Sequence, residues 1–155
     1  FTSCARARRT GSFFGDGAQR GPDFTAEALH YITVYMDEYH QAAFQRENGR
    51  APNDMERKII GEDIKAELKA NRYDEAGNIV TLTEAQAYAL GKLKTYYTDI
   101  FIDKNAEGSF PPKGYITDRK EVENLASFYF WGAWVCGTIW LFLQRSLPVL
   151  ESTPT

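Results

Sequence analysis

A run of residues without charge near the carboxyl end constrains this chain more than any other feature. Residues 124–144 read NLASFYFWGAWVCGTIWLFLQ and hold all three tryptophans of the chain, but no Asp, Glu, Lys or Arg. As a helix, residues 125–143 would extend about 28 Å, close to the hydrocarbon thickness of a bilayer. The small residues Gly132, Ala133 and Gly137 are typical of membrane helices that pack closely against neighbours. We therefore predict a transmembrane helix over residues 124–144, with a buried helix of a soluble core as the alternative.

The rest of the chain has the composition of one small globular domain. The chain has 155 residues, and its formal net charge of −3 provides no basic field for binding nucleic acid. Residues 11–123 read as helices joined by turns with one small hairpin, which predicts a mainly α fold. Residues 1–10 read as an atypical or disordered start, and residues 145–155 as a short tail without structure. The predicted order is therefore a start segment, a helical domain, a membrane helix and a tail.

Local signals place three helices and the hairpin. Thr25 is the predicted N-cap of a first helix that ends near Gly49. Capping-box patterns, in which a Glu or Gln follows three residues after the cap, open two further helices after Asn53 and Thr83. Between these two helices, residues 71–82 have the pattern of a small hairpin.

A fourth helix is predicted to open at Thr117, after a loop that contains Pro111 and Pro112. No stop signal lies between this start and the charge-free run, so the helix can continue directly into the predicted span. Arg145 is the one basic residue that follows the span, and the basic residues before it are few. The positive-inside rule alone therefore does not decide the orientation of the span.

The two histidines, His30 and His40, limit any site that needs imidazole. Ten residues along one helix place them about 15 Å apart and about 80° around the axis, so they cannot bind one metal together. Glu27 and Asp37 each precede a histidine by three residues, as in the half-motifs of di-iron bundles. Such a site needs these motifs on two facing helices, whereas both motifs here lie on one. We interpret all four side chains as surface or boundary polar residues.

The other candidates for chemistry are equally weak. Cys4 lies in the atypical start and Cys136 lies in the charge-free run, and neither has a candidate base nearby. The glycines of Gly15-Asp16-Gly17 lack the Lys-Ser/Thr of a phosphate-binding loop and are interpreted as turn residues. The sequence has no C-x-x-C-H for covalent haem attachment. We predict no catalytic, cofactor-binding or metal-binding residue in this chain.

Three ordered blocks of sequence carry a family resemblance. The first, residues 11–32, reads GSFFGDGAQRGPDFTAEALHYI. The second consists of NRYD at residues 71–74 and TLTEAQA at residues 81–87, and the third is LASFYFWGAW at residues 125–134. In this order and spacing the blocks resemble the outer domain, and the start of the membrane core, of the quinol-dependent nitric oxide reductases.

The resemblance implies a cytochrome c-like helical domain without haem, followed by a transmembrane helix. It places residues 11–123 on the extracytoplasmic side of a bacterial or archaeal plasma membrane and Arg145 towards the cytoplasm. Enzymes of this family reduce two NO molecules to N2O and water with electrons from a quinol, a reaction of denitrification and anaerobic respiration. Their haem b, haem b3 and non-haem iron are bound by later membrane helices, which would be the partners of this chain in the bilayer. Alone, the chain is expected to be inactive.

Both ends of the chain depart from the family pattern. Residues 1–10 do not match the family's preceding segment, and after Thr138 an R-P-G is expected where residues 139–143 read IWLFL. We therefore expect a truncated fragment, and a disrupted reading frame or an engineered chain would each account for it. Residues 139–155 have no assigned role. The alternative function is a free-standing, tail-anchored helical module that docks a partner or senses a signal outside the membrane.

Overall fold

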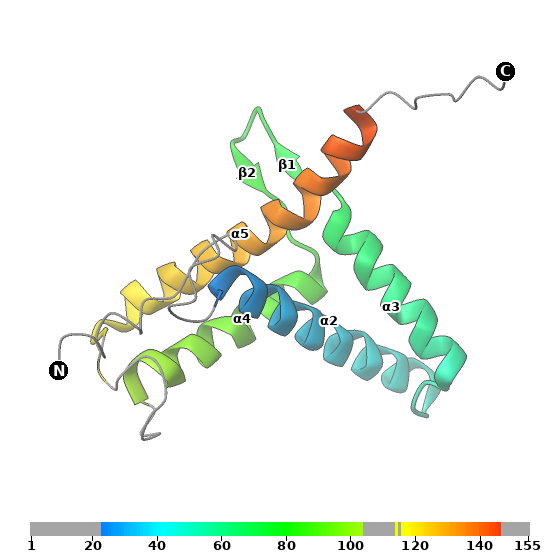
Figure 1. Ribbon diagram of the computed structural model, residues 1–155. Helices are drawn as coiled ribbons and strands as arrows, with labels where there is room; N and C mark the ends of the chain where they lie inside the picture. The colour runs from blue at the N-terminus through cyan, green and yellow to red at the C-terminus, as the bar shows by residue number, and fades with distance from the viewer. Residues whose placement is uncertain (1–22, 104–113, 115, 147–155) are drawn as a thin grey trace, which may run out of the picture.

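A computed structural model describes residues 23–103, 114 and 116–146, with side chains described as far as residue 136. The part described is mainly helical with one small antiparallel hairpin, as the sequence predicts (Figure 1). Its elements are helices α2 (Phe24–Asn48), α3 (Asp54–Lys69), α4 (Glu84–Thr98) and α5 (Arg119–Ser146), strands β1 (Tyr73–Asp74) and β2 (Ile79–Val80), and a π-helical turn η2 (Asp99–Asp103).

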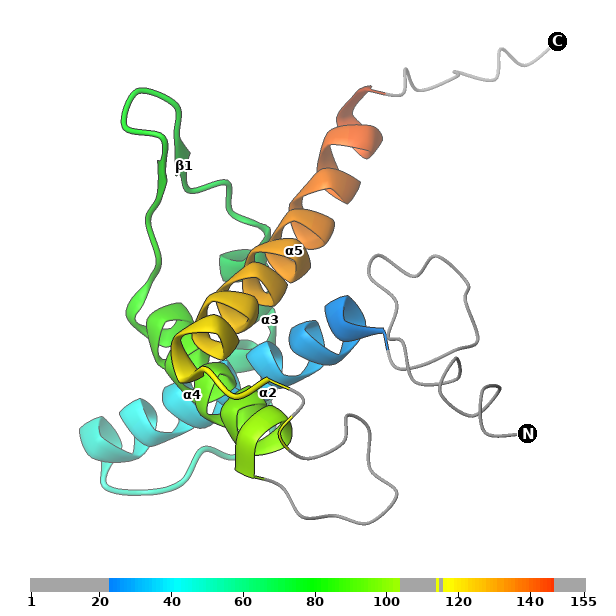
Figure 2. The ribbon, with the colours of Figure 1, turned by 90° about the vertical axis from the view of Figure 1, so that its left-hand side faces the viewer.

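The helices α2, α4 and α5 pack against one another, and α3 packs against α2 and α5. The first half of α5 lies across α2 and α4, whereas its second half projects beyond them (Figures 1 and 2). The hairpin projects on the same side as the end of α5. The domain is thus a bundle in which α5 touches every other long helix of the described chain.

The hydrophobic core runs through the position where the sequence placed a boundary between soluble domain and membrane span. Ala126 and Ala133 of α5 are fully buried, and Phe130 is 5% exposed. They join one cluster with residues of the other helices: Ala28, Ile32 and Met36 of α2, Ile60 and Ile64 of α3, and Ala85, Ala89, Leu93 and Tyr97 of α4. The first half of the charge-free run is therefore part of the domain core, as in the buried-helix alternative.

The predicted transmembrane helix at residues 124–144 is not confirmed. Over the residues that the structure describes, no helix combines the length and the apolarity needed to cross a bilayer. Helix α5 carries four charged residues in its amino-terminal turns, Arg119, Lys120, Glu121 and Glu123. Its apolar residues from 126 to 134 then turn one face towards α2 and α4 rather than towards lipid.

Several predicted features lie outside the described residues. They are the start segment 1–10 with Cys4, the glycines at positions 15 and 17, the prolines at 111 and 112, the side chains at 139–143 and the tail at 147–155.

The first helix begins two residues earlier than the sequence suggested. Its N-cap is Asp23, whose Oδ1 accepts hydrogen bonds from the backbone N–H groups of Thr25 at 2.9 Å and Ala26 at 3.2 Å. Thr25, the predicted cap, is instead a buried residue of the first turn, 5% exposed. The predicted end is confirmed, because Gly49 closes the helix with a φ of 67°, in the left-handed region that glycine enters without strain.

The other local signals are largely confirmed. Both predicted capping boxes are present, at Asn53 and at Thr83. The hairpin pairs Tyr73 with Val80 and Asp74 with Ile79, inside the predicted range. The fourth helix differs by two residues: it starts at Arg119, and Asp118 rather than Thr117 accepts the backbone N–H of Lys120 at 2.9 Å.

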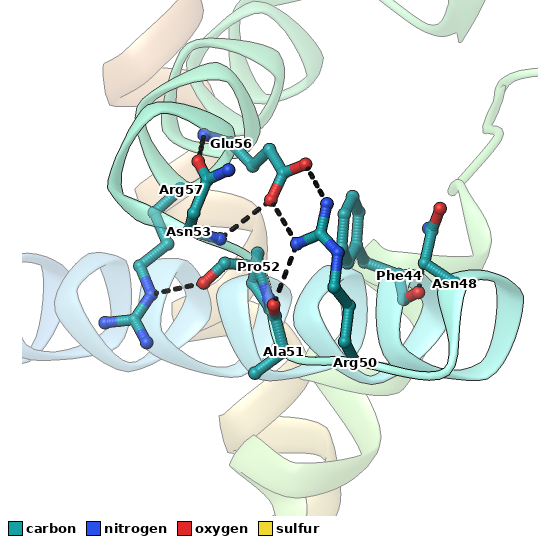
Figure 3. Close-up of polar contacts among 8 residues, drawn as sticks. All are labelled: Phe44, Asn48, Arg50, Ala51, Pro52, Asn53, Glu56 and Arg57. Carbon is teal, nitrogen blue, oxygen red and sulfur yellow. Dashed lines mark hydrogen bonds and ion pairs between the residues drawn. The ribbon is translucent and has the colours of Figure 1, made fainter.

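An ion pair fixes the connection between α2 and α3 (Figure 3). The Arg50 guanidinium donates to both carboxylate oxygens of Glu56, at 2.8 and 2.6 Å, and lies over the Phe44 ring at 5.3 Å. Glu56 also accepts the backbone N–H of Asn53 at 2.7 Å, which completes the capping box of α3. These donors, the guanidinium first, lower the pKa of Glu56 from 4.5 to about 2. The carboxylate therefore stays charged well into the acid range.

Acid should reduce the stability that the Arg50–Glu56 ion pair provides, and Glu56→Gln should lack this pH-dependent part. Because the folded pKa of Glu56 is depressed, its contribution to stability is present above pH 4.5 and is lost as the pH falls towards 2. The urea midpoint of the wild type should exceed that of Glu56→Gln near neutral pH, and the difference should shrink over that range. Glu75→Gln, which removes an exposed carboxylate of the hairpin turn, is the matched control. A difference that stays constant with pH would contradict the assigned role.

Truncation tests whether α5 belongs to the core. A chain ending at residue 123 loses Ala126, Phe130 and Ala133, whereas one ending at residue 136 keeps them. Deleting one large core side chain costs about 2–5 kcal/mol, and a domain of this size has only about 5–15 kcal/mol in total. The shorter chain should therefore lose its near-ultraviolet circular dichroism and its cooperative urea transition, and the longer one should keep both. Equal midpoints for the two chains would show that α5 is dispensable.

Candidate functional site

The two histidines have separate surroundings. His40 of α2 lies with its Nε2 3.1 Å from Glu67 Oε2 of α3, and Glu67 also accepts a hydrogen bond from the hydroxyl of Thr83. His40 therefore belongs to a polar junction of three segments: α2, the end of α3 and the cap of α4. His30 is exposed on α2 and makes an edge contact with the Tyr31 ring, with centroids 5.3 Å apart.

The carboxylates that precede the histidines point to other partners. Glu27 accepts a hydrogen bond from Tyr96 Oη of α4 at 3.1 Å, and Asp37 accepts one from Gln41 Nε2 at 2.6 Å. Neither carboxylate therefore forms a ligand pair with the histidine three residues on. Within the described part of the chain, no three His, Cys, Asp or Glu side chains come together in a group that could hold a metal ion.

Aromatic rings fill the interior where α2, α4 and α5 meet. Phe24 stacks on Tyr129 with centroids 4.9 Å apart, and Tyr129 meets the edge of Tyr97 at 5.1 Å. Tyr97 also contacts Phe101 of η2 at 6.0 Å. These rings are closely packed side chains of three different helices and a turn. The centre of the bundle is therefore a packed core rather than a cofactor cavity.

Three hydrogen bonds from tyrosine to glutamate join α2 to α4. Tyr39 donates to Glu84 at 2.6 Å, Tyr88 donates to Glu38 at 3.2 Å, and Tyr96 donates to Glu27 at 3.1 Å. The first two pairs are exposed, whereas the third is partly buried. Sequence reasoning missed these pairs, because each bond joins positions at least 45 apart along the chain.

The phenols of Tyr96 and Tyr97 differ although they are neighbours in sequence. Burial, the bond to Tyr31 and the charge of Glu27 raise the pKa of Tyr96. Tyr97 is completely buried, and its hydroxyl has no hydrogen-bond partner among the described residues. Burial is also the first cause that raises the pKa of Tyr97. Both phenols are therefore neutral at physiological pH. Tyr96 donates a hydrogen bond to Glu27, and the charge of the same carboxylate also raises the pKa of Tyr97.

A small apolar notch lies between the hairpin and α5. It has a volume of about 150 Å³ and is lined by Val80, Leu82, Phe130, Trp131 and Trp134. Trp131 is 47% exposed at its rim and stacks on Phe128, which is 48% exposed. The sequence assigned both tryptophans to a lipid-facing helix and did not bring the hairpin to them. This mainly apolar lining suits an apolar partner.

Among the described residues, the arrangement offers contact surfaces and buried polar pairs but no catalytic constellation. Cys136 is a free, exposed thiol on α5, and no ion pair or hydrogen bond of the described residues joins it to a base. The described chain therefore shows no nucleophile activated by a neighbouring group.

One comparison identifies a family for this chain. The family model of the NorB cytochrome c-like domain of nitric oxide reductase matches residues 5–140, well over half of the chain. The match includes all three sequence blocks on which the resemblance rests, and it does not distinguish the quinol-dependent form. A comparison with curated proteins finds no match.

The matched family is described as cytochrome c-like, which raises the question of a haem, and the residues that the structure describes do not fit one. Covalent attachment needs a C-x-x-C-H motif, which the sequence lacks. The His40 ring lies against Glu67, and His30 is on the outer surface of α2. Closely packed rings, including those of Phe24 and Tyr97, occupy the centre of the described bundle. The likeness to a cytochrome c is thus one of helical architecture.

The contrast between Tyr96 and Tyr97 predicts opposite effects of the same chemical change. Tyr96→Phe removes a hydrogen bond to a carboxylate and should lower the free energy of unfolding by about 1 kcal/mol. Tyr97→Phe removes a buried hydroxyl without a partner among the described residues, and should leave stability unchanged or raise it by up to about 1 kcal/mol. Urea titrations measure both changes in the free energy of unfolding, provided that the variants keep the m-value of the wild type. A loss in Tyr97→Phe as large as that in Tyr96→Phe would contradict the assignment.

Proposed function

The chain belongs to the family of the NorB cytochrome c-like domain of nitric oxide reductase, and we propose that it is the non-catalytic, N-terminal portion of a quinol-dependent enzyme of this kind. In the whole reductase, two NO molecules, two electrons and two protons give N2O and water, with quinol as the electron donor. The family match over residues 5–140 is the observation that carries this proposal. The three ordered sequence blocks support the quinol-dependent form in particular.

The proposed role of the domain is to cover the outer mouth of the catalytic membrane core. Its interior of close-packed rings and its capped helices give it a rigid body, which suits a cover rather than a moving lid. The exposed pair Phe128 and Trp131, with the adjacent notch, offers the apolar surface that such a contact needs. The partners are then the remaining membrane helices of the reductase, with the domain on the extracytoplasmic side of a bacterial or archaeal plasma membrane.

The same proposal includes the point along α5 at which the chain enters the membrane. The second half of α5 leaves the bundle, and residues 137–144 continue the charge-free run. We place the start of the membrane-embedded chain in this second half, beyond the residues of α5 that pack in the core. Arg145 then faces the cytoplasm.

Catalysis is assigned to the membrane core of the enzyme. NO reduction needs redox centres, and side chains alone supply no suitable couple. The haem b, haem b3 and non-haem iron of the family would be held by later helices. The residues of this chain would keep water from the outer face of that core and shape the approach of quinol or NO to it.

Co-expression with a family reductase that lacks its own cytochrome c-like domain tests the proposal. The chain should co-purify with the truncated reductase and raise its rate of NO consumption with reduced quinol. Phe128→Asp should weaken this association, whereas Ile59→Asp, which charges a similarly exposed apolar residue on α3, should not. Failure to associate, with both proteins folded, would support the docking or sensor alternative.

The same measurement on the chain alone tests its inactivity. Prepared in detergent with reduced quinol, the 155 residues should consume NO no faster than buffer does. Turnover that disappears in His30→Ala or His40→Ala would overturn this assignment and would restore a metal site to α2.

A further inference from the structure

We infer that Tyr96 is a redox-active tyrosine, which passes its phenolic proton to Glu27 when a one-electron oxidant removes its electron. This goes beyond the proposed role as a cover and does not depend on it. The geometry that carries the inference is the bond from Tyr96 to Glu27, the ring contacts that link Tyr96 to the surface, and the contrast with its neighbour Tyr97.

Tyr96 has a proton acceptor already in place. A phenol that loses an electron becomes strongly acidic. Its oxidation is therefore easiest where a base already accepts a hydrogen bond from the phenol and can take the proton. Tyr96 Oη lies 3.1 Å from Glu27 Oε1, within hydrogen-bond reach. In the balanced step the oxidant gains one electron, the O–H bond of Tyr96 breaks, and the proton binds the Glu27 carboxylate. The products are a neutral tyrosyl radical, a neutral glutamic acid and the reduced oxidant.

A row of aromatic rings leads from Tyr96 towards the surface. The Tyr96 ring lies 4.2 Å from that of Tyr31, and Tyr31 stacks on Tyr35 with centroids 5.9 Å apart. Tyr31 and Tyr35 are half-buried on α2, and the adjacent Val34 is 45% exposed. An oxidant that meets α2 at this position therefore has a row of touching rings between itself and Tyr96.

The neighbouring tyrosines show why Tyr96 differs from them. Tyr97 lies 5.2 Å from Tyr96 and is fully buried, but no hydrogen bond of normal geometry joins its hydroxyl to a base among the described residues. The Glu27 carboxylate, whose charge also reaches Tyr97, accepts the hydrogen bond of Tyr96. Tyr39 and Tyr88 do bond to glutamates, but both bonds are exposed, and a radical there would be open to reaction with solutes. Tyr96 combines a base with partial burial, which favours a radical that persists.

The oxidant is identified by class. It must accept one electron and be strong enough to oxidise a phenol, as nitrogen dioxide radicals and photogenerated ruthenium(III) complexes are. The site therefore captures an oxidising equivalent that reaches α2 and holds it in the half-buried contact between α2 and α4.

A photochemical experiment on the full chain tests the inference. A ruthenium polypyridyl complex is attached at Val34→Cys, with Ser in place of both native cysteines, and is oxidised by a flash in the presence of a sacrificial acceptor. Transient absorption and electron paramagnetic resonance should show a neutral tyrosyl radical. In Glu27→Gln its formation should slow by about a hundredfold, the size of a typical general-base contribution.

Matched variants assign the radical. Tyr97→Phe and Tyr88→Phe should give the wild-type signal, whereas Tyr96→Phe should abolish the long-lived component. Since Tyr96→Phe also loses a hydrogen bond, 3-fluorotyrosine placed at position 96 provides a variant of nearly unchanged shape, in which fluorine hyperfine splitting should appear. A persistent radical without that splitting, or one equally strong in folded Tyr96→Phe, would overturn the inference, as would unchanged kinetics in Glu27→Gln.

Discussion

The burial of one face of α5 is the interaction on which the rest of this structure depends. Val122, Ala126 and Ala133 are fully buried, and their small side chains allow α5 to approach α2 and α4 closely. Without this face, the core residues of α2 and α4 would meet water along one side of the bundle. The same packing bears on the interpretation of the charge-free run. An apolar helix can bury its side chains against other helices of the domain or against lipid, and this one buries a face against α2 and α4. Its first half is a structural part of the domain.

Polar side-chain contacts also join the packed helices. Helices α2 and α4 also pack directly on each other, and three tyrosines meet three glutamates across this pair. A separate junction of His40, Glu67 and Thr83 ties α3 to the start of α4. These contacts hold a rigid helical body, which we propose covers the outer face of a nitric oxide reductase core. In this proposal, the exposed pair Phe128 and Trp131 of α5 is the docking surface.

Local features could be predicted from the sequence, and features that depend on packing could not. The capping boxes at Asn53 and Thr83, and the stop at Gly49, are set by neighbours within a few residues, so their patterns are sufficient. Asp23 was missed in favour of Thr25 because both are good caps, and only the burial of Thr25 decides between them. The Tyr96–Glu27 bond and the notch at Trp131 and Val80 join distant segments, and no pattern along the chain reports them. The predicted span at residues 124–144 is not confirmed over the described residues, and a long apolar run fits a buried helix and a membrane helix equally well.

Site-resolved hydrogen exchange of the full chain in lipid nanodiscs tests the central claim, that α5 is part of the domain core. We predict that the amides of Ala126, Phe130 and Ala133 exchange with the same free energy of opening as those of Ile32 in α2 and Leu93 in α4, because all belong to one cooperative cluster. Denaturant should lower all of these free energies with one common slope. The contrary result is that the α5 amides open separately, with a free energy that denaturant does not change, while the α2 and α4 amides keep their protection. In that case α5 does not hold the domain together.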